Sequence, residues 1–228
     1  RYARRVFTWS RQRGHFTGTN PAKGLDAPKE RKKRTLPSDD ALLKLLNYSR
    51  QGNGATYIGL VMEIMYLCRM RGIEVLDMTD ANELPDGLLI HRRKGSRDNI
   101  VRWSPHLKTI WKVAKGRRDE IIDTRKAPVA LKPELRYIFL ADRGGGRLTK
   151  DGFNTGWNRF VRKAIDDGVI TKEERFSPHD LKRKGVTDTK GTRAEKKEAS
   201  GHKSDAMLDV YDLEIQLVNP AGKETQNS

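Results

Sequence analysis

The first 35 residues combine one helical stretch with one charged stretch. Tyr2, Val6 and Trp9 recur at helical spacing among arginines, which predicts a helix with one packed face. Asn20 and Pro21 should end this helix. Residues 26–34 are highly charged and poor in apolar side chains, as in a linker. A second domain is therefore expected to begin at residue 36.

The second domain opens with two predicted helices. Pro37 and Ser38, followed by two aspartates, form a helix-start pattern before the apolar positions of ALLKLL. The stretch from Thr56 to about Met70 is apolar nearly all round. It predicts a core helix with Arg71 at its end.

A hairpin and an amphipathic helix follow. Residues 88–91 and 99–103 are short β-like runs, joined by a turn that carries Lys94. Apolar side chains between residues 153 and 165 recur at helical spacing, and Gly168 should end that helix. The pattern predicts a mixed α+β fold that is mainly helical, with a small β-sheet or hairpin.

The C-terminal part predicts three more helices. Ser177 starts a helix that opens with His179, and Lys182 shares the same helix face. Two short helical stretches come after it, separated by Gly201, and Tyr211 falls near the end of the second.

The charge indicates a polyanionic ligand. The chain has 46 basic and 30 acidic residues, a net charge of +16 and an isoelectric point near 10.0. Residues 1–35 hold eleven basic and two acidic side chains, which is +9 of that excess. A solvated basic face is the alternative explanation for charge alone. The candidate DNA-binding residues are Arg31, Lys32, Lys33, Arg34, Arg93 and Arg97.

The single cysteine and the apolar stretches further restrict the class of protein. Cys68 excludes a disulfide framework and indicates a reducing compartment, and its apolar neighbours predict that it is buried. The longest apolar stretch, residues 57–68, is interrupted by Glu63 and is too short to span a bilayer. The chain begins at Arg1 without a methionine or a secretory pattern, so we expect a fragment of a longer protein.

Each candidate catalytic residue has an ordinary structural explanation when taken alone. Arg71 can pair with Glu74, Lys94 can be a solvated charge on a turn, and the histidines can cap or pack. Tyr211 can be a core aromatic. Together they offer a nucleophile, cations to hold a phosphodiester and a proton donor, which is chemistry for cutting DNA without a metal or cofactor. The set is Arg71, Lys94, His179, Lys182, His202 and Tyr211.

The first two of these segments resemble boxes of the tyrosine recombinases, also called the phage integrase family. YLCRMRGIEVLDM resembles the first box, in which an arginine is followed three residues later by an acid, here Arg71 and Glu74. RRKGSRDNIVRW resembles the hairpin that carries the catalytic lysine of the family, which corresponds to Lys94.

The remaining boxes occur in the same order. HDLKRKGVTDT resembles the second box through His179 and Asp180, with Lys182 where the family usually has arginine. ASGHKSDAMLDVY resembles the closing box, with His202 nine residues before Tyr211. An ammonium is a point charge whereas a guanidinium is a planar fork, so Lys182 is a departure with chemical consequences.

The resemblance implies the tyrosine recombinase catalytic fold over residues 36–215. It also implies that residues 1–25 end a core-binding domain, that residues 26–35 form a basic linker, and that residues 216–228 are a tail that contacts another subunit. The implied function is site-specific recombination or integration of a mobile genetic element. The partners would be double-stranded DNA and further copies of the chain, as a tetramer on paired sites. A bacterial cytoplasmic protein associated with the nucleoid is expected.

The implied mechanism gives each residue a role. Tyr211 attacks the scissile phosphate to form a 3′-phosphotyrosyl intermediate, with His179 as the base. Arg71, Lys182 and His202 contact the phosphate, and Lys94 protonates the leaving 5′-oxygen. Glu74 and Asp180 orient these groups.

Three other functions stay open at this point. A type IB topoisomerase shares the tyrosine chemistry but rejoins the same strand, so a requirement for two DNA sites would separate it from a recombinase. Lys182 in place of arginine also leaves open a DNA-binding protein that has lost catalysis. A purely structural basic domain would make the ordered boxes a coincidence.

Overall fold

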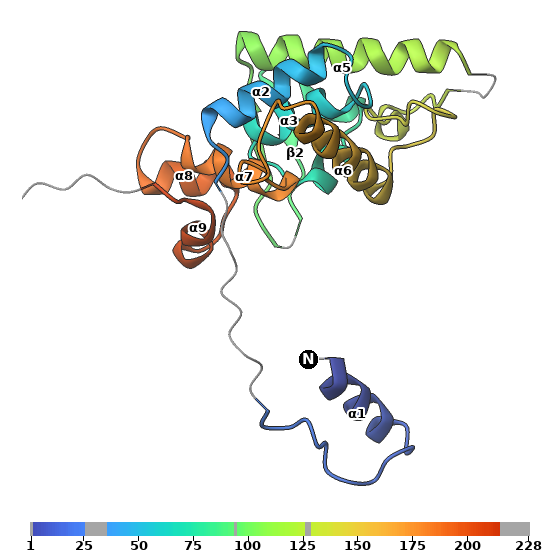
Figure 1. The fold of residues 1–228 in the computed structure, drawn as a ribbon, viewed down its shortest axis with the longest axis vertical. Coiled ribbons are helices and arrows are strands. Elements are labelled where there is room, and N and C mark those ends of the chain that lie inside the picture. The colour runs from blue at the N-terminus through green and yellow to red at the C-terminus, as the bar shows by residue number, and fades with distance from the viewer. Residues whose placement is uncertain (1, 26–35, 94, 126–128, 215–228) are drawn as a thin grey trace, which may run out of the picture. The chain divides into compact units, whose positions relative to one another are not determined.

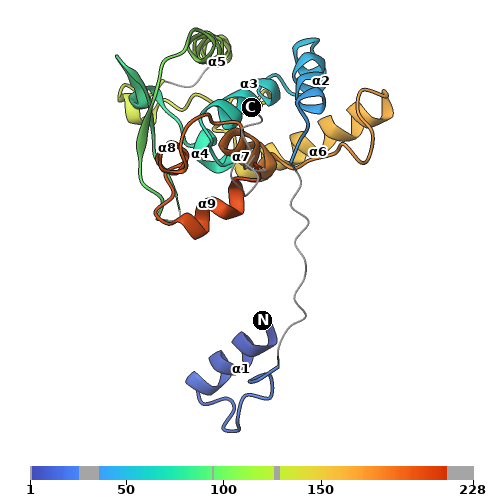
Figure 2. The same ribbon diagram turned by 90° about the vertical axis from the view of Figure 1, so that its left-hand side faces the viewer.

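The computed structural model describes residues 2–25, 36–93, 95–125 and 129–214. The chain divides into two compact units, Arg1–Arg34 and Thr35–Ser228, and each is described by itself. Figures 1 and 2 show the same ribbon in two views. The positions of the two units relative to each other are not determined, and the described catalytic candidates all lie in the second unit.

The first unit contains helix α1, Tyr2–Gln12. The helix is confirmed, but it ends well before Asn20 and Pro21, so the predicted end is wrong. The predicted packed face is also wrong within this unit, since Tyr2 and Trp9 are exposed. Asn20 instead folds back on the helix, where its Nδ2 donates to the carbonyl of Arg4 at 2.9 Å.

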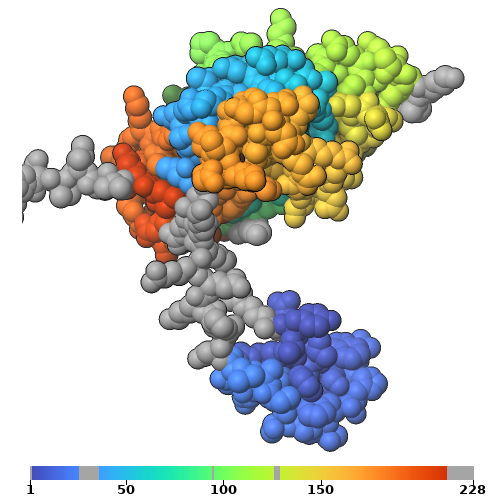
Figure 3. All heavy atoms as spheres, viewed as in Figure 1, coloured from blue at the N-terminus to red at the C-terminus, as the bar shows by residue number. Residues whose placement is uncertain are grey.

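The second unit is mainly helical with a small sheet. Its helices are α2 Asp39–Arg50, α3 Ile58–Leu67, α4 Gly72–Leu76, α5 Pro105–Asp123, α6 Lys150–Asp166, α7 Pro178–Thr187, α8 Arg193–Ser200 and α9 Asp205–Tyr211. Two single turns of 3-10 helix, η1 and η2, span Asp80–Asn82 and Pro133–Leu135. Figure 3 shows α2 and α6 covering one face of the unit.

The sheet has three antiparallel strands in the order β1-β2-β3. The strands are β1 Glu83–Leu84, β2 Gly87–Ile90 and β3 Asn99–Arg102. The predicted hairpin is β2 and β3, with Leu88 opposite Val101. The pattern of alternating residues did not identify β1, because two residues are too few to show a period.

Local sequence explains where the helices begin. The hydroxyl of Ser38 accepts from the backbone N–H of Ala41 at 3.1 Å, and two aspartates follow in the first turn of α2. Ser104 caps α5 in the same way, ahead of Pro105 at the first helical position. Helix α5 was not anticipated from the sequence, although Leu107, Ile110 and Trp111 form its buried side.

Helix α3 is the centre of the hydrophobic core. Its residues Ile58, Val61 and Met65 are fully buried, and helices α2, α5 and α7 pack around it. The predicted single helix up to about Met70 is wrong, because the chain turns at Arg69, whose φ is 53°. Cys68 lies buried just before that turn, as the sequence indicated, and burial raises the pKa of its thiol to about 12.

The crossing of α3 and α7 is close enough to require a glycine. A Cβ atom added at Gly185 would lie 2.3 Å from the carbonyl oxygen of Tyr66, a backbone atom that cannot move aside without shifting a helix. This contact sets the distance between the core helix and the helix that carries His179 and Lys182.

We predict that Gly185→Ala lowers the free energy of unfolding by about 1–3 kcal/mol, because the methyl group forces the two helices apart. Gly116→Ala is the matched control, since Gly116 is in α5 with nothing within 4 Å of an added Cβ. That substitution should raise stability by about 0.5–1 kcal/mol through helix propensity. Urea denaturation measures the free energy of unfolding of both variants. An equal change in the two variants would contradict the close crossing of α3 and α7.

Candidate active site around Tyr211

Arg71 lies at the turn between α3 and α4, where its side chain and backbone both bind Glu74. The carboxylate of Glu74 accepts from Arg71 Nη1 at 2.7 Å and from the Arg71 backbone N–H at 2.8 Å. Arg71 is therefore the first residue of a local capping arrangement at the start of α4. Arg71 therefore forms the ion pair with Glu74 and is also a member of the candidate site.

Helix α7 contributes His179, Asp180 and Lys182. The carboxylate of Asp180 accepts from the backbone N–H and the hydroxyl of Ser177, at 2.8 and 2.6 Å, which fixes the helix start. Its other oxygen binds Arg183. His179 is exposed, whereas Lys182 is fully buried and its Nζ has no hydrogen-bond partner among the residues that the structure describes.

The turn between α8 and α9 presents His202. Gly201 ends α8 in the left-handed conformation with φ 72°, and the chain reverses there. His202 is buried, and its Nδ1 lies 2.9 Å from the hydroxyl of Ser200. Within the described part of the chain, its Nε2 has no hydrogen-bond partner. Ser204 then caps α9, with its hydroxyl 3.3 Å from the Met207 N–H.

The described candidates converge on the ring of Tyr211. The ring centroid of Tyr211 is 4.6 Å from that of His202 and 5.5 Å from that of His179. The Nζ of Lys182 lies 5.3 Å from the centroid of the same ring, and the Arg71 guanidinium is close enough to interact electrostatically with the Tyr211 phenol. Tyr211 itself is only 5% exposed. Arg71, helix α7 and the turn between α8 and α9 therefore meet at one phenol.

The site carries more positive charge than it neutralises. Burial, aided by the charges of Arg92 and Arg71, lowers the pKa of Lys182 to about 7 against the pull of Glu74. Burial and the charge of Lys182 lower the pKa of His202 to about 4. For His179 the pKa also falls, through desolvation and then the charge of Arg183. These shifts favour the neutral form of both imidazoles and weaken the positive charge of Lys182.

The proton on His202 depends on Ser200. The Ser200 hydroxyl lies 3.1 Å from the carbonyl of Lys197 and 2.9 Å from His202 Nδ1, and it has one hydrogen to donate. If the hydrogen goes to Nδ1, His202 carries its proton on Nε2, facing the site. If it goes to Lys197, Nε2 is an acceptor.

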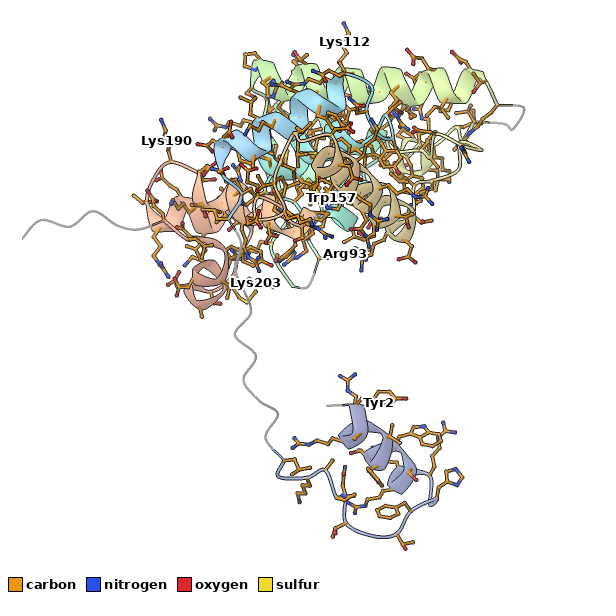
Figure 4. The ribbon with its side chains drawn as sticks, viewed as in Figure 1. Tyr2, Arg93, Lys112, Trp157, Lys190 and Lys203 are labelled. Atoms are coloured by element: carbon orange, nitrogen blue, oxygen red, sulfur yellow. The ribbon has the colours of Figure 1, made fainter. Side chains whose placement is uncertain are left out.

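The β2–β3 hairpin contributes residues at its base. The backbone N–H of Arg93 donates to Glu74 at 3.0 Å, and its guanidinium pairs with Asp77 at 2.7 Å. Arg97 is exposed, and its N–H donates to the carbonyl of Gly201 at 2.9 Å. Figure 4 labels Arg93 and Lys203 toward the end of the unit that carries α9, with Lys112 of α5 toward the opposite end. The remaining predicted residues lie outside the described ones: Lys94, Arg31, Lys32, Lys33 and Arg34.

Arg92 belongs to this region and was missed from the sequence. It is buried, and its guanidinium donates to the carbonyls of Arg69 at 2.6 Å, Cys68 at 3.0 Å and Ala199 at 3.2 Å. The side-chain oxygen of Asn99 is a fourth acceptor, at 3.0 Å. Arg92 thus joins the hairpin to the turn before Arg71 and to the end of α8. No local pattern distinguishes it from its exposed neighbour Arg93.

A large cavity lies elsewhere in the same unit. Its volume is about 680 Å³, and it is lined by parts of α2, α3 and α5 that include Leu60, Glu63 and Arg117. None of the residues around Tyr211 lines it, so cavity volume alone would have pointed away from the catalytic candidates.

Comparisons with known proteins show the fold. No family model matches the chain, and no curated protein matches it. The structure resembles XerA recombinase with a TM-score of 0.60 at 17% identity, covering 79% of this chain and 61% of that one. It resembles a lambda integrase dimer bound to a COC′ core site with a TM-score of 0.67 at 16% identity, covering 95% and 59%.

A third solved structure gives the same result. The Tn1549 transposon integrase in complex with circular intermediate DNA matches with a TM-score of 0.64 at 13% identity, covering 93% of this chain and 72% of that one. The second unit has the tyrosine-recombinase fold. The predicted mixed, mainly helical class with a small sheet is confirmed. The chain spans about three fifths of the XerA and lambda integrase chains.

Among the described residues, no helix of this tyrosine-recombinase fold combines the length and apolar character needed to cross a membrane.

The lowered pKa of Lys182 makes a prediction about stability. The folded-state pKa, about 7, lies below the ordinary 10.5, so the unfolded chain binds more protons between these values and stability rises with pH there. We expect Lys182→Met to stabilise the fold by several kcal/mol, on the order of the shift, at pH 6, and by progressively less as pH approaches 10.5.

Lys184→Met is the control on the same helix. Lys184 is also buried, but Asp188 at 2.7 Å and Asp39 at 2.5 Å outweigh its desolvation and raise its pKa. The stabilisation that the charged Lys184 provides is fully present below pH 10.5. Lys184→Met should therefore destabilise the fold at neutral pH. Urea denaturation at pH 6, 8 and 9.5 measures both. If the gain in stability of Lys182→Met does not change with pH, then burying the charged ammonium of Lys182 is not what destabilises the unsubstituted protein.

Proposed function

We propose that this protein is a site-specific DNA recombinase or integrase that cuts and rejoins strands through a 3′-phosphotyrosyl intermediate. The observation that carries the proposal is the convergence of Arg71, His179, Lys182 and His202 on the ring of Tyr211. A phenol surrounded by cations and neutral imidazoles is suited to attack a phosphodiester, whose charge those cations stabilise. The likeness in fold to three recombinases and integrases supports the same reaction.

In the proposed reaction the oxygen of Tyr211 bonds to phosphorus, and the bond from phosphorus to the 5′-oxygen breaks. A phenol has an ordinary pKa of about 10, so its proton must leave during the attack. His179 accepts that proton, since its lowered pKa keeps the imidazole neutral. Lys94 gives a proton to the leaving 5′-oxygen. A 5′-hydroxyl from another strand reverses these steps and rejoins the DNA.

Arg71 and Lys182 hold the non-bridging oxygens in this proposal. A phosphate beside Lys182 opposes the neighbouring arginines, so DNA binding raises the pKa of Lys182 and charges it fully. His202 donates from Nε2 only when the Ser200 hydroxyl gives its hydrogen to Nδ1 and leaves the carbonyl of Lys197. Glu74 and Asp180 orient Arg71 and the start of α7.

The proposed partner is double-stranded DNA bound by several copies of the chain. Lambda integrase has been solved as a tetramer bound to a Holliday junction, and that structure matches this chain with a TM-score of 0.66 at 17% identity. We propose that residues 1–25 end a core-binding domain, that 26–35 are a basic linker on DNA, that 36–215 form the catalytic domain, and that 216–228 contact a neighbouring subunit. Arg93 and Arg97 would add phosphate contacts from the hairpin, in a nucleoid-associated cytoplasmic protein.

One observation favours a second candidate, a DNA-binding protein with impaired catalysis. Lys182 stands where a permanently charged guanidinium would be expected, and burial lowers the pKa of its ammonium to about 7 in the free protein. Covalent capture of DNA separates the two candidates.

We expect Tyr211→Phe to abolish the covalent protein–DNA adduct while DNA affinity stays nearly unchanged, because the substitution removes one hydroxyl and little surface. A nicked suicide DNA substrate and a denaturing gel measure the adduct. Tyr137→Phe is the matched control, since Tyr137 packs on Arg147 outside the site. An adduct that persists in Tyr211→Phe identifies another nucleophile, and no adduct in the unsubstituted protein favours the impaired binder.

The second box makes a further prediction. Lys182→Ala should slow single-turnover cleavage by at least roughly a hundredfold, the cost typical of losing one preorganised donor. Lys182→Arg should retain or raise the rate, because the guanidinium stays charged and can bind two oxygens. Arg183→Ala should have a much smaller effect, since Arg183 pairs with Asp180. An essential Arg183 beside a dispensable Lys182 would contradict the assignment.

A further inference from the structure

Helix α9 is attached to the rest of the fold through a small hydrophobic cluster of its own. Val186 of α7, with Leu208 and Tyr211 of α9, forms a buried group separate from the main core around α3. A cluster of this size buries little apolar surface, so it stabilises the position of α9 only weakly. The placement of Tyr211 therefore needs additional contacts.

Lys196 of α8 supplies such contacts immediately after Tyr211. Its side chain is buried, yet its Nζ pairs with Asp212 at 3.1 Å and also with Glu214. The carbonyl of Thr187, at the end of α7, is a third acceptor at 3.3 Å. One ammonium thus joins α8, α7 and the segment that leaves α9.

Thr187 binds the same segment through its side chain. The Thr187 hydroxyl donates to the carbonyl of Tyr211 at 3.2 Å and accepts from the N–H of Leu213 at 3.1 Å. The backbone on both sides of Asp212 is therefore held to the end of α7. We call Lys196, Thr187, Asp212 and Glu214 the Lys196 latch.

The latch stays charged despite its burial. Burial lowers the pKa of Lys196, but the hydrogen bonds that its ammonium donates to Glu214 and Asp212 outweigh burial and raise the pKa above its ordinary value. Lys182 shows the opposite balance, since its ammonium is buried without a partner. A permanently charged ammonium with two carboxylates is a firm attachment for a short helix.

We propose that Lys196 is a positioning residue whose ion pairs with Asp212 and Glu214 hold Tyr211 against the cations of its own subunit. The proposal rests on the proposed function only in naming Tyr211 as the nucleophile. When the latch opens, α9 leaves its small cluster and the tyrosine becomes accessible. The latch thus decides how much of the protein has its nucleophile in place.

The test measures the accessibility of Tyr211 without DNA. The protein is treated with tetranitromethane, and nitration of each tyrosine is followed by mass spectrometry of its peptide. In Lys196→Met we expect Tyr211 to react about tenfold faster than in the unsubstituted protein, the effect of losing about one charge-assisted contact on the opening equilibrium. Tyr2, which is 82% exposed, calibrates the reagent, and the core tyrosines Tyr48 and Tyr57 should stay protected.

Two variants serve as controls. Lys197→Met removes the next lysine of α8, which pairs with Asp205 at 3.0 Å from a more exposed position, and should leave Tyr211 protected. Lys196→Arg keeps a cation that both carboxylates can bind, and should retain most of the protection. Equal reactivity of Tyr211 in Lys196→Met and the unsubstituted protein would overturn the proposal, and so would an equal rise in Lys197→Met.

A second variant covers the case in which Lys196→Met loosens the whole unit. Nitration of Tyr48 and Tyr57 would reveal that loss, and Asp212→Asn combined with Glu214→Gln then removes the charges from the other side. A selective rise at Tyr211 in that variant supports the latch, and continued protection overturns it. With suicide DNA, Lys196→Met should form adduct more slowly at unchanged affinity, by the factor by which the closed population falls. If the unsubstituted protein forms none, the proposed function fails while nitration still reports on the latch.

Discussion

The site depends on burying cations around a single phenol with little negative charge to balance them. Arg71, Arg92 and Lys182 act on one another, and Glu74 is the carboxylate that faces them. Such an arrangement is costly for the empty protein, because each ammonium or guanidinium loses water without gaining a full counter-charge. The same excess of positive charge would favour the binding of an anion. If carboxylates neutralised these cations fully, the site would attract an anion less strongly.

The rest of the fold holds these buried cations in place, although their burial is unfavourable. The apolar helix α3 holds α7 through a contact that leaves no room beyond a glycine hydrogen at residue 185. Helix α7 in turn carries His179 and Lys182, and its last turn holds the segment after Tyr211. The amount of hydrophobic packing therefore decreases from the main core to α7 and then to α9. Tyr211 lies in the last of these, where the hydrophobic cluster is smallest.

Sequence reasoning recovered the elements whose signals are local. Helix α7 was predicted from its Ser-Pro start and the β2–β3 hairpin from its alternation, and both are present. The end of α3 could not be predicted, because an arginine in a left-handed turn has no distinctive composition. The catalytic candidates were found by their order along the chain. The charge state of Lys182 was not, since burial depends on residues more than a hundred positions away.

The carbonyl of Ala199 shows how tightly the site is tied to its surroundings. It accepts from Arg69 at 3.1 Å, from Arg92 at 3.2 Å and from Asn99 at 3.1 Å, although an oxygen has two lone pairs. Losing any one donor changes the balance for the others, because two arginines and an amide share one acceptor. We therefore expect substitutions at these three positions to have coupled rather than additive effects on stability. Related chains should keep all three side chains or replace them together, even where the surface around them diverges.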